Sequence, residues 1–170
     1  MHDERYVHVR QRAEAYEAWY EKERVCAHIA GNCREEAEKI LAQADSSWRI
    51  SFSFEDRWDM EPCREPFTLK EMIWDISPNG DPEWIFMLNR HEYMNKLLIA
   101  GWLTGDKAYV EKLKWFLFHW IQANPILPEG TVTTRTIDTG IRCMSWQYLL
   151  LHLLGEALWR KEKPQESWRA

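Results

Sequence analysis

The stretch from residue 81 to residue 150 constrains the fold most, because its apolar residues recur at helical spacing. It predicts three amphipathic helices, over residues 83–103, from residue 107 to about 123, and from about 134 to 160. Gly105 can close the first helix, since glycine readily takes the left-handed conformation found at helix ends. Asp106 can then cap the second helix through its side chain.

The remainder of the chain predicts two further helices and one extended segment. Residues 3–24 and 34–45 have helix-favouring compositions, and 46–59 alternate apolar and polar residues with a period of two. Residues 60–82 contain four prolines and are expected to be mostly irregular. We therefore predict a mainly α fold over residues 1–170, in a single helical domain, with a short extended segment near residues 47–55.

Composition excludes several classes of protein. The net charge of −5 argues against nucleic acid as a partner, because binding to phosphates favours a basic surface. No apolar stretch approaches the ~20 residues that a membrane-spanning helix needs, and the N-terminus lacks the apolar region of a signal peptide. An acidic glycan is compatible with this charge, because binding it needs only local basic residues.

The four cysteines show no CxxC spacing, so neither a metal site nor a cofactor is predicted. Buried free thiols are the favoured interpretation, while a Cys26–Cys33 disulfide stays open. Free thiols favour a reducing compartment. We accordingly expect a cytoplasmic protein, or a periplasmic or secreted one if a leader has been removed.

Two arginines and an aspartate share one face of the third predicted helix. Arg135, Asp138 and Arg142 lie at positions i, i+3 and i+7, so the carboxylate can pair with both guanidinium groups. One interpretation is that Asp138 orients the arginines toward an acidic ligand. The other is a solvated salt-bridge network, which surface ion pairs commonly form. Gly140 within the same helix predicts close packing there.

The first predicted helix carries a second polar group, Asn89-Arg90-His91, among aromatic residues. His91 could bind a sugar or transfer protons near neutral pH. The alternative is a core histidine with a hydrogen-bond partner. Aromatic surface together with guanidinium groups suits an anionic sugar, because the rings pack on the sugar and the guanidinium groups bind its acid. Eleven tryptophans supply more aromatic surface than most chains have, and most are expected in the core.

An ordered set of short motifs resembles the heparinase II/III family of polysaccharide lyases over roughly residues 45–155. The set comprises Trp84, Phe86, Leu88-Asn89-Arg90-His91, Thr104-Gly105-Asp106, Tyr109, Trp120, Asn124-Pro125, Arg135-Thr136, Gly140-Ile141-Arg142 and Trp146. The resemblance implies an incomplete (α/α) toroid of antiparallel helical hairpins. It also implies a bacterial lyase that cleaves uronic-acid glycans, such as glycosaminoglycans or alginate, by β-elimination.

The resemblance implies that the usual catalytic residues lie further downstream, in the rest of the toroid and a following β-sandwich. We therefore assign no catalytic residue and expect this chain alone to be inactive. The residues expected to bind an acidic polysaccharide or oligosaccharide are Trp84, Asn89, Arg90, His91, Arg135, Asp138, Arg142 and Trp146. Helix faces left uncovered by the incomplete toroid would allow a homodimer. A non-catalytic glycan-binding domain and a helical-hairpin interaction module remain as alternatives.

Overall fold

The computed structural model describes residues 11, 15, 21–55, 62–125, 127 and 129–159, with side chains described as far as residue 153. This part of the chain is mainly helical, as predicted, with one two-stranded antiparallel sheet. The elements are α2 (Lys22–Asn32), α3 (Arg34–Trp48), β1 (Ser51–Phe54), β2 (Cys63–Thr68), α4 (Pro82–Arg90), α5 (Glu92–Thr104), α6 (Lys107–Ala123) and α7 (Thr136–Trp159). Most of the helix predicted over residues 3–24 lies outside the described residues.

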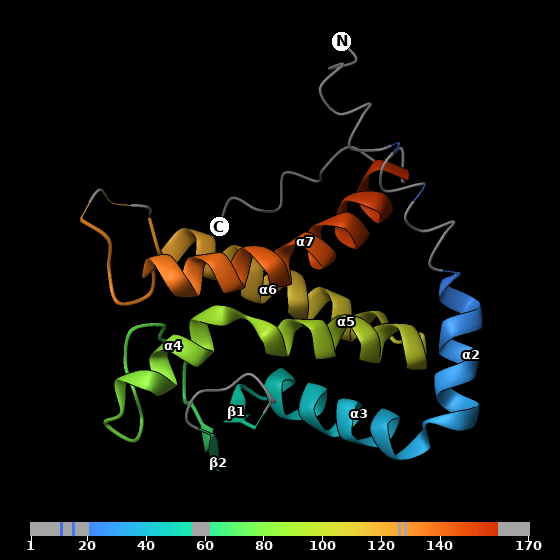
Figure 1. The fold of residues 1–170 in the computed structure, drawn as a ribbon, viewed down its shortest axis with the longest axis horizontal. Coiled ribbons are helices and arrows are strands. Elements are labelled where there is room, and N and C mark those ends of the chain that lie inside the picture. Colours follow the sequence, from blue (N-terminus) through green and yellow to red (C-terminus); the bar gives the residue numbers. More distant parts are fainter. Residues whose placement is uncertain are drawn as a thin grey trace.

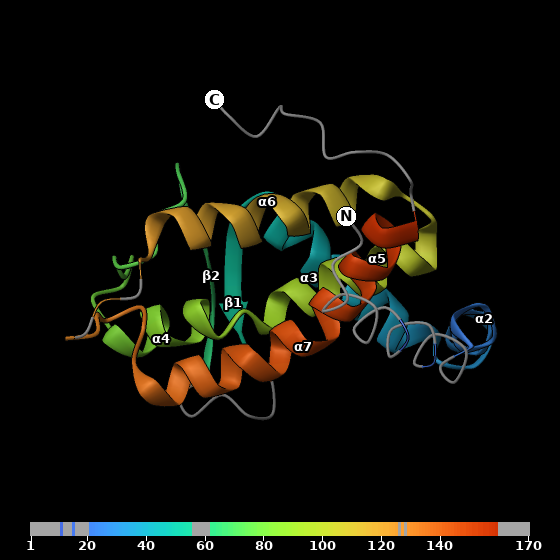
Figure 2. The ribbon, with the colours of Figure 1, turned by 90° about the horizontal axis from the view of Figure 1, so that it is seen from above.

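Helix α5 is the centre of the arrangement, because α3, α6 and α7 all pack against it. Figure 1 shows α6 and α7 above α5 and α3 beneath it, and Figure 2, seen from above, shows α6 and α7 to either side of α5. The chain reverses direction between α5 and α6, and again between α6 and α7, so these neighbours are antiparallel (Figure 1). No helix in the described ranges is long and apolar enough to cross a membrane.

The turn between α5 and α6 follows the predicted capping chemistry. Gly105 has a left-handed φ of 72° and its N–H donates to the carbonyl of Gly101. The Asp106 side chain accepts a hydrogen bond of 2.8 Å from the N–H of Ala108. A Cβ atom at Gly101 would lie 3.0 Å from a methyl group of Val110, so this glycine allows α5 and α6 to approach closely.

The helix predicted over residues 83–103 is in fact two helices, which meet at His91. His91 has a left-handed φ of 63°, so α4 ends at Arg90 and α5 begins at Glu92. The prediction was wrong because a histidine carries no helix-breaking signal, and the apolar spacing continues across the break. Left-handed backbone is costly outside glycine, so the packing around His91 has to hold it.

The predicted alternation near residues 47–55 is confirmed in β1, where Phe52 and Phe54 are buried between more exposed serines. Strand β2 was not predicted, because Pro66 falls within it. Both strands of a two-stranded sheet are edge strands, where a proline can be accommodated. Phe52 then packs in the aromatic core, with its ring centroid 4.8 Å from that of Tyr93 and 6.0 Å from that of Phe116.

Candidate functional site

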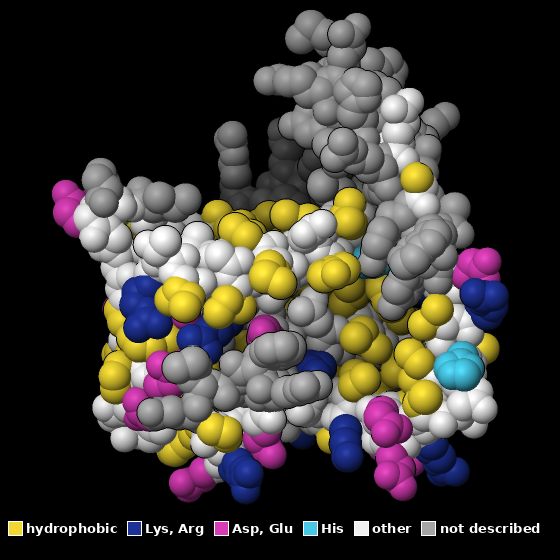
Figure 3. All heavy atoms as spheres, in the orientation of Figure 1, with side chains coloured by type: hydrophobic (Ala, Val, Ile, Leu, Met, Phe, Trp, Pro, Cys, Tyr) yellow, Lys and Arg dark blue, Asp and Glu magenta, His cyan; other side chains and the backbone are white. Residues whose placement is uncertain are grey.

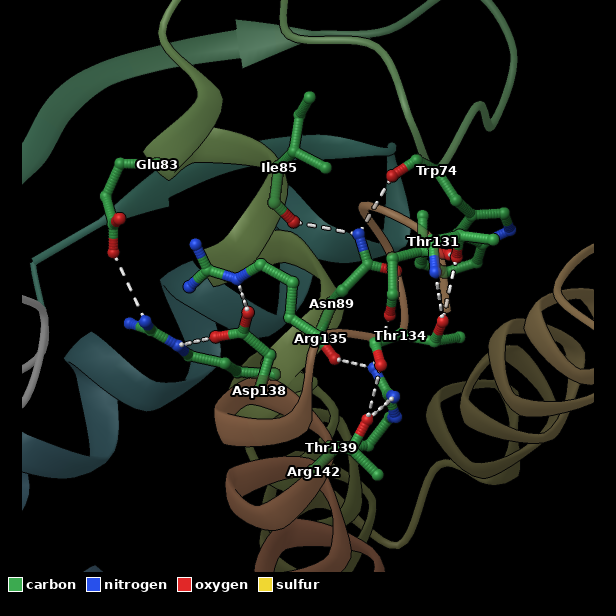
Figure 4. A network of polar contacts seen from close by, with 12 residues as sticks. Trp74, Glu83, Ile85, Asn89, Thr131, Thr134, Arg135, Asp138, Thr139 and Arg142 are labelled. Carbon is green, nitrogen blue, oxygen red and sulfur yellow. Dashed lines mark hydrogen bonds and ion pairs between the residues drawn. The ribbon is translucent and has the colours of Figure 1, made fainter. Parts of the chain in front are cut away.

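A buried carboxylate joins α4 to the start of α7. Asp138 is fully buried and accepts hydrogen bonds from Nε of Arg90 at 2.9 Å and from Nε of Arg135 at 2.7 Å (Figure 4). Arg90 also donates to Glu83 at 3.2 Å, so two carboxylates neutralise this buried guanidinium. A buried ion pair of this kind needs complete pairing, because each unpaired charge costs several kcal/mol.

Arg142 makes a different connection from the one predicted. Its Nη1 donates to the backbone carbonyl of Asn89 at 2.6 Å and to that of Thr133 at 3.0 Å. Its guanidinium also lies 4.1 Å from the centre of the Trp120 ring, a cation–π geometry. Arg142 is 3% exposed, and burial lowers the pKa of its guanidinium. The side chain thus fixes α7 to the end of α4 rather than pairing with Asp138.

The Asn89 amide connects three segments that are distant in the sequence. Its Nδ2 donates to the carbonyls of Trp74 and Ile85, both at 2.8 Å, and its Oδ1 accepts from the indole N–H of Trp120 at 2.7 Å. The side chain is fully buried, and each of these bonds satisfies a polar group that water cannot reach. Figure 4 shows this amide between the carbonyl groups of Trp74 and Ile85.

His91 is enclosed by aromatic rings at the break between the two helices. Its Nδ1 accepts a hydrogen bond of 2.9 Å from the indole N–H of Trp146, and the two rings stack at 5.8 Å. Burial, and to a smaller extent Arg142, lowers the pKa of His91 well below its ordinary value. The imidazole is therefore neutral, and its Nε2 is a buried donor without a partner among the described residues.

Arg135 is the one predicted arginine that reaches the surface. Its side chain is 38% exposed, and its guanidinium lies 3.2 Å from the centre of the Phe86 ring. Only its Nε is engaged by described residues, so both terminal nitrogens can donate to a ligand. Arg135 lines a shallow depression with Glu129, Gly130, Thr131, Thr134, Thr136 and Ile137.

A family model described as Heparinase II/III N-terminus matches residues 4–157. The chain belongs to the heparinase II/III family. This match begins at residue 4 and so includes most of the segment before residue 45, where the sequence motifs carried no family signal. No curated protein and no solved structure matches the chain. Among the described residues of this heparinase II/III domain, no group of three His, Cys, Asp or Glu side chains could hold a metal ion.

The structure brings seven of the eight predicted site residues together, and Trp84 alone is apart from them. Five of the seven are at least 95% buried: Asn89, Arg90, His91, Asp138 and Arg142. This burial contradicts the solvated salt-bridge interpretation of the α7 cluster. The other two, Arg135 and Trp146, are partly exposed. Contact between these residues of the heparinase II/III domain and a glycan stays a prediction.

The two predicted stacking residues differ in environment. Trp84 is fully buried in the aromatic core and presents no ring face to solvent. Trp146 is half-buried and packs on His91, as described above. Gly140 was expected to mark close packing, but it is exposed and a Cβ atom there would meet nothing within 4 Å. The cysteines are free as predicted, yet none is fully buried and Cys143 is exposed.

Sequence reasoning missed three contributors to this network. Glu83 pairs with Arg90, the carbonyl of Trp74 accepts from Asn89, and the carbonyl of Thr133 accepts from Arg142. Two of the three act through backbone groups in loops, which no side-chain motif reveals. Glu83 had a usable signal, since it lies seven residues before Arg90 and so on the same side of a helix.

Proposed function

We propose that the chain is the helical N-terminal domain of a lyase that cleaves uronic-acid-containing polysaccharides by β-elimination, and that it contributes part of the substrate cleft. Its membership of the heparinase II/III family carries this proposal. The antiparallel order of α5, α6 and α7 supports the start of an (α/α) toroid. An acidic polysaccharide is the corresponding partner.

The reaction explains why cationic donors matter at such a cleft. β-Elimination at a uronic acid removes the proton next to the carboxylate and expels the oxygen on the neighbouring carbon. A group that neutralises the carboxylate makes that proton more acidic and stabilises the anionic intermediate. A base takes the proton and an acid protonates the leaving oxygen. We assign none of these three catalytic roles to a residue of this chain.

Arg135 is the residue best placed for substrate binding. Its exposed terminal nitrogens can bind a carboxylate through two parallel hydrogen bonds. Asp138 and the Phe86 ring hold the guanidinium from two sides, so little side-chain entropy is lost on binding. The buried residues Asn89, Arg90, His91 and Arg142 then act as positioning residues, because they fix α4 and α7 on either side of this arginine.

The test incubates the protein with a panel of uronic-acid polysaccharides. The readout is the ultraviolet absorbance of the unsaturated product. A rise with one glycan supports the lyase proposal and names the substrate. Binding of an acidic oligosaccharide without a rise supports the cleft role and leaves cleavage to groups beyond this chain. If no acidic glycan binds and none yields the unsaturated product, the proposal is contradicted.

A further inference from the structure

A lysine lies between two exposed tryptophans where the end of α3 meets α6. Trp48 ends α3, while Lys112 and Trp115 belong to α6. The Lys112 ammonium is 4.0 Å from the ring centre of Trp115 and 5.9 Å from that of Trp48. None of these three residues lines the Arg135 depression at the start of α7, and Figure 2 shows α6 and the start of α7 as different parts of the fold, so the cluster is distinct from that depression.

The two indoles expose an unusual amount of aromatic surface. Trp48 is 49% exposed and Trp115 is 40% exposed, whereas Trp74, Trp84 and Trp120 are buried in the core. Neither exposed indole N–H has a hydrogen-bond partner among the described residues. Each indole therefore presents apolar ring surface to solvent, next to an N–H group that can donate to a ligand.

The lysine in this cluster differs from its neighbours in lacking a counter-charge among the described residues. No carboxylate among the described residues pairs with Lys112, whereas Lys114, two residues away, pairs with Glu111 at 2.8 Å. Partial burial lowers the pKa of Lys112, so its charge is poorly solvated. The nearest side chains are aromatic, including Phe116 at 5.0 Å from the ammonium. An anion arriving here would meet an unpaired cation in apolar surroundings.

We propose that Trp48, Lys112 and Trp115 form a second binding site for acidic glycans. A sugar ring packs on an indole face and its carboxylate or sulfate binds the Lys112 ammonium. The choice of a glycan as ligand rests on the proposed function. A neutral sugar would gain only the ring contact and leave the lysine unpaired, so the site discriminates by charge.

Isothermal titration calorimetry with uronic-acid tetrasaccharides tests the site, and a neutral cello-tetrasaccharide tests its charge selectivity. We expect Lys112→Gln to weaken binding of the acidic ligand about tenfold, the loss that one charge-assisted hydrogen bond represents. Lys112→Arg keeps the charge and should bind nearly as the parent protein does. Lys114→Gln is the matched control and should leave the affinity unchanged. Trp48→Ala removes an exposed ring and should also weaken binding.

Unchanged affinity in both Lys112→Gln and Trp48→Ala would overturn this inference. Equal affinity for the neutral tetrasaccharide would do the same, as would a failure of every acidic tetrasaccharide to bind. The outcome is separable from that of the proposed function. Binding that depends on Arg135 but not on Lys112 contradicts the second site alone. Binding that depends on Lys112, in a protein that forms no unsaturated product, supports the second site but gives no support for lyase activity.

Discussion

Nη1 of Arg142 donates a 2.6 Å hydrogen bond to the backbone carbonyl of Asn89, two residues before the left-handed His91. The break at His91 ends α4, and the last carbonyls of a helix have no partner within it. The guanidinium satisfies one of these carbonyls and is itself held over Trp120. The break and the packing of α7 are therefore directly linked through the Arg142 guanidinium.

We expect Asn89→Ala to destabilise the fold by about 3 kcal/mol, because it leaves the buried Trp120 N–H and the Trp74 carbonyl unpaired. Asn95→Ala is the matched control, since Asn95 is a half-buried asparagine on α5 and should change stability by less than about 0.5 kcal/mol. Chemical denaturation of both variants measures the difference. Equal stability of the two would contradict the structural role of the Asn89 amide.

Asp138→Asn should cost about 3 kcal/mol of unfolding free energy, because it removes the carboxylate that Arg90 and Arg135 share within the protein. Glu38→Gln breaks the exposed pair with Arg34 and should cost less than about 0.5 kcal/mol. Thermal and urea unfolding of the two variants compares a buried with a solvated pair. Similar losses in both would show that Asp138 is not the junction of α4 and α7.

Stability should fall as the pH drops below ~6.5, the ordinary pKa of histidine in an unfolded chain. Burial lowers the pKa of His91 in the folded protein, and it lowers the pKa of His152 to about 4. Between these values the unfolded chain binds protons that the folded chain does not, so acid favours unfolding. Each such histidine contributes a slope of up to ~1.4 kcal/mol per pH unit.

The His91→Asn variant isolates the contribution of this residue, because asparagine also accepts left-handed backbone. Urea unfolding at pH 7, 6 and 5 should give a shallower loss of stability for the variant than for the parent protein. The same slope in both proteins would mean that His91 is not the buried neutral group described above.

An exposed apolar stripe on α7 predicts self-association of the chain. Ile137, Met144 and Tyr148 are 63%, 68% and 52% exposed, and Figure 3 shows hydrophobic side chains gathered over this helix. Monomeric proteins seldom expose a contiguous patch of this kind. Sedimentation equilibrium should detect a dimer, which Met144→Glu disrupts. Ile76→Glu, at an equally apolar exposed position, is the control and should leave the dimer intact.

The regular helices of this fold follow from the sequence because their signals are local. The Gly105 and Asp106 turn, the end of α6 at Ala123 and the alternation in β1 each depend on neighbouring residues. The break at His91 does not, because it depends on an arginine that follows it by 51 residues and on rings from three other segments. Strand β2 likewise exists only through its pairing with β1.

The sequence predicted part of the polar network around Asp138 but not the environment of that network. The spacing of Arg135 and Asp138 correctly predicts that the two side chains pair, although α7 begins at Thr136, one residue after Arg135. The same spacing could not show that Asp138 would pair with Arg90 instead of Arg142, or that both would be buried. Burial is set by the approach of α4 to α7, which depends on the break that the sequence pattern conceals.

The most direct test of the proposed glycan cleft is the affinity of Arg135→Gln for an acidic oligosaccharide, measured by isothermal titration calorimetry. Asp138 keeps its ion pair with Arg90 in this variant, so we expect the protein to fold with reduced stability, which urea unfolding measures alongside. The variant loses the guanidinium and its two free donors. We predict binding about tenfold weaker than that of the parent protein, while the exposed-site control Arg34→Gln binds normally. Parent-like affinity in Arg135→Gln would contradict the assignment of this arginine to the substrate cleft.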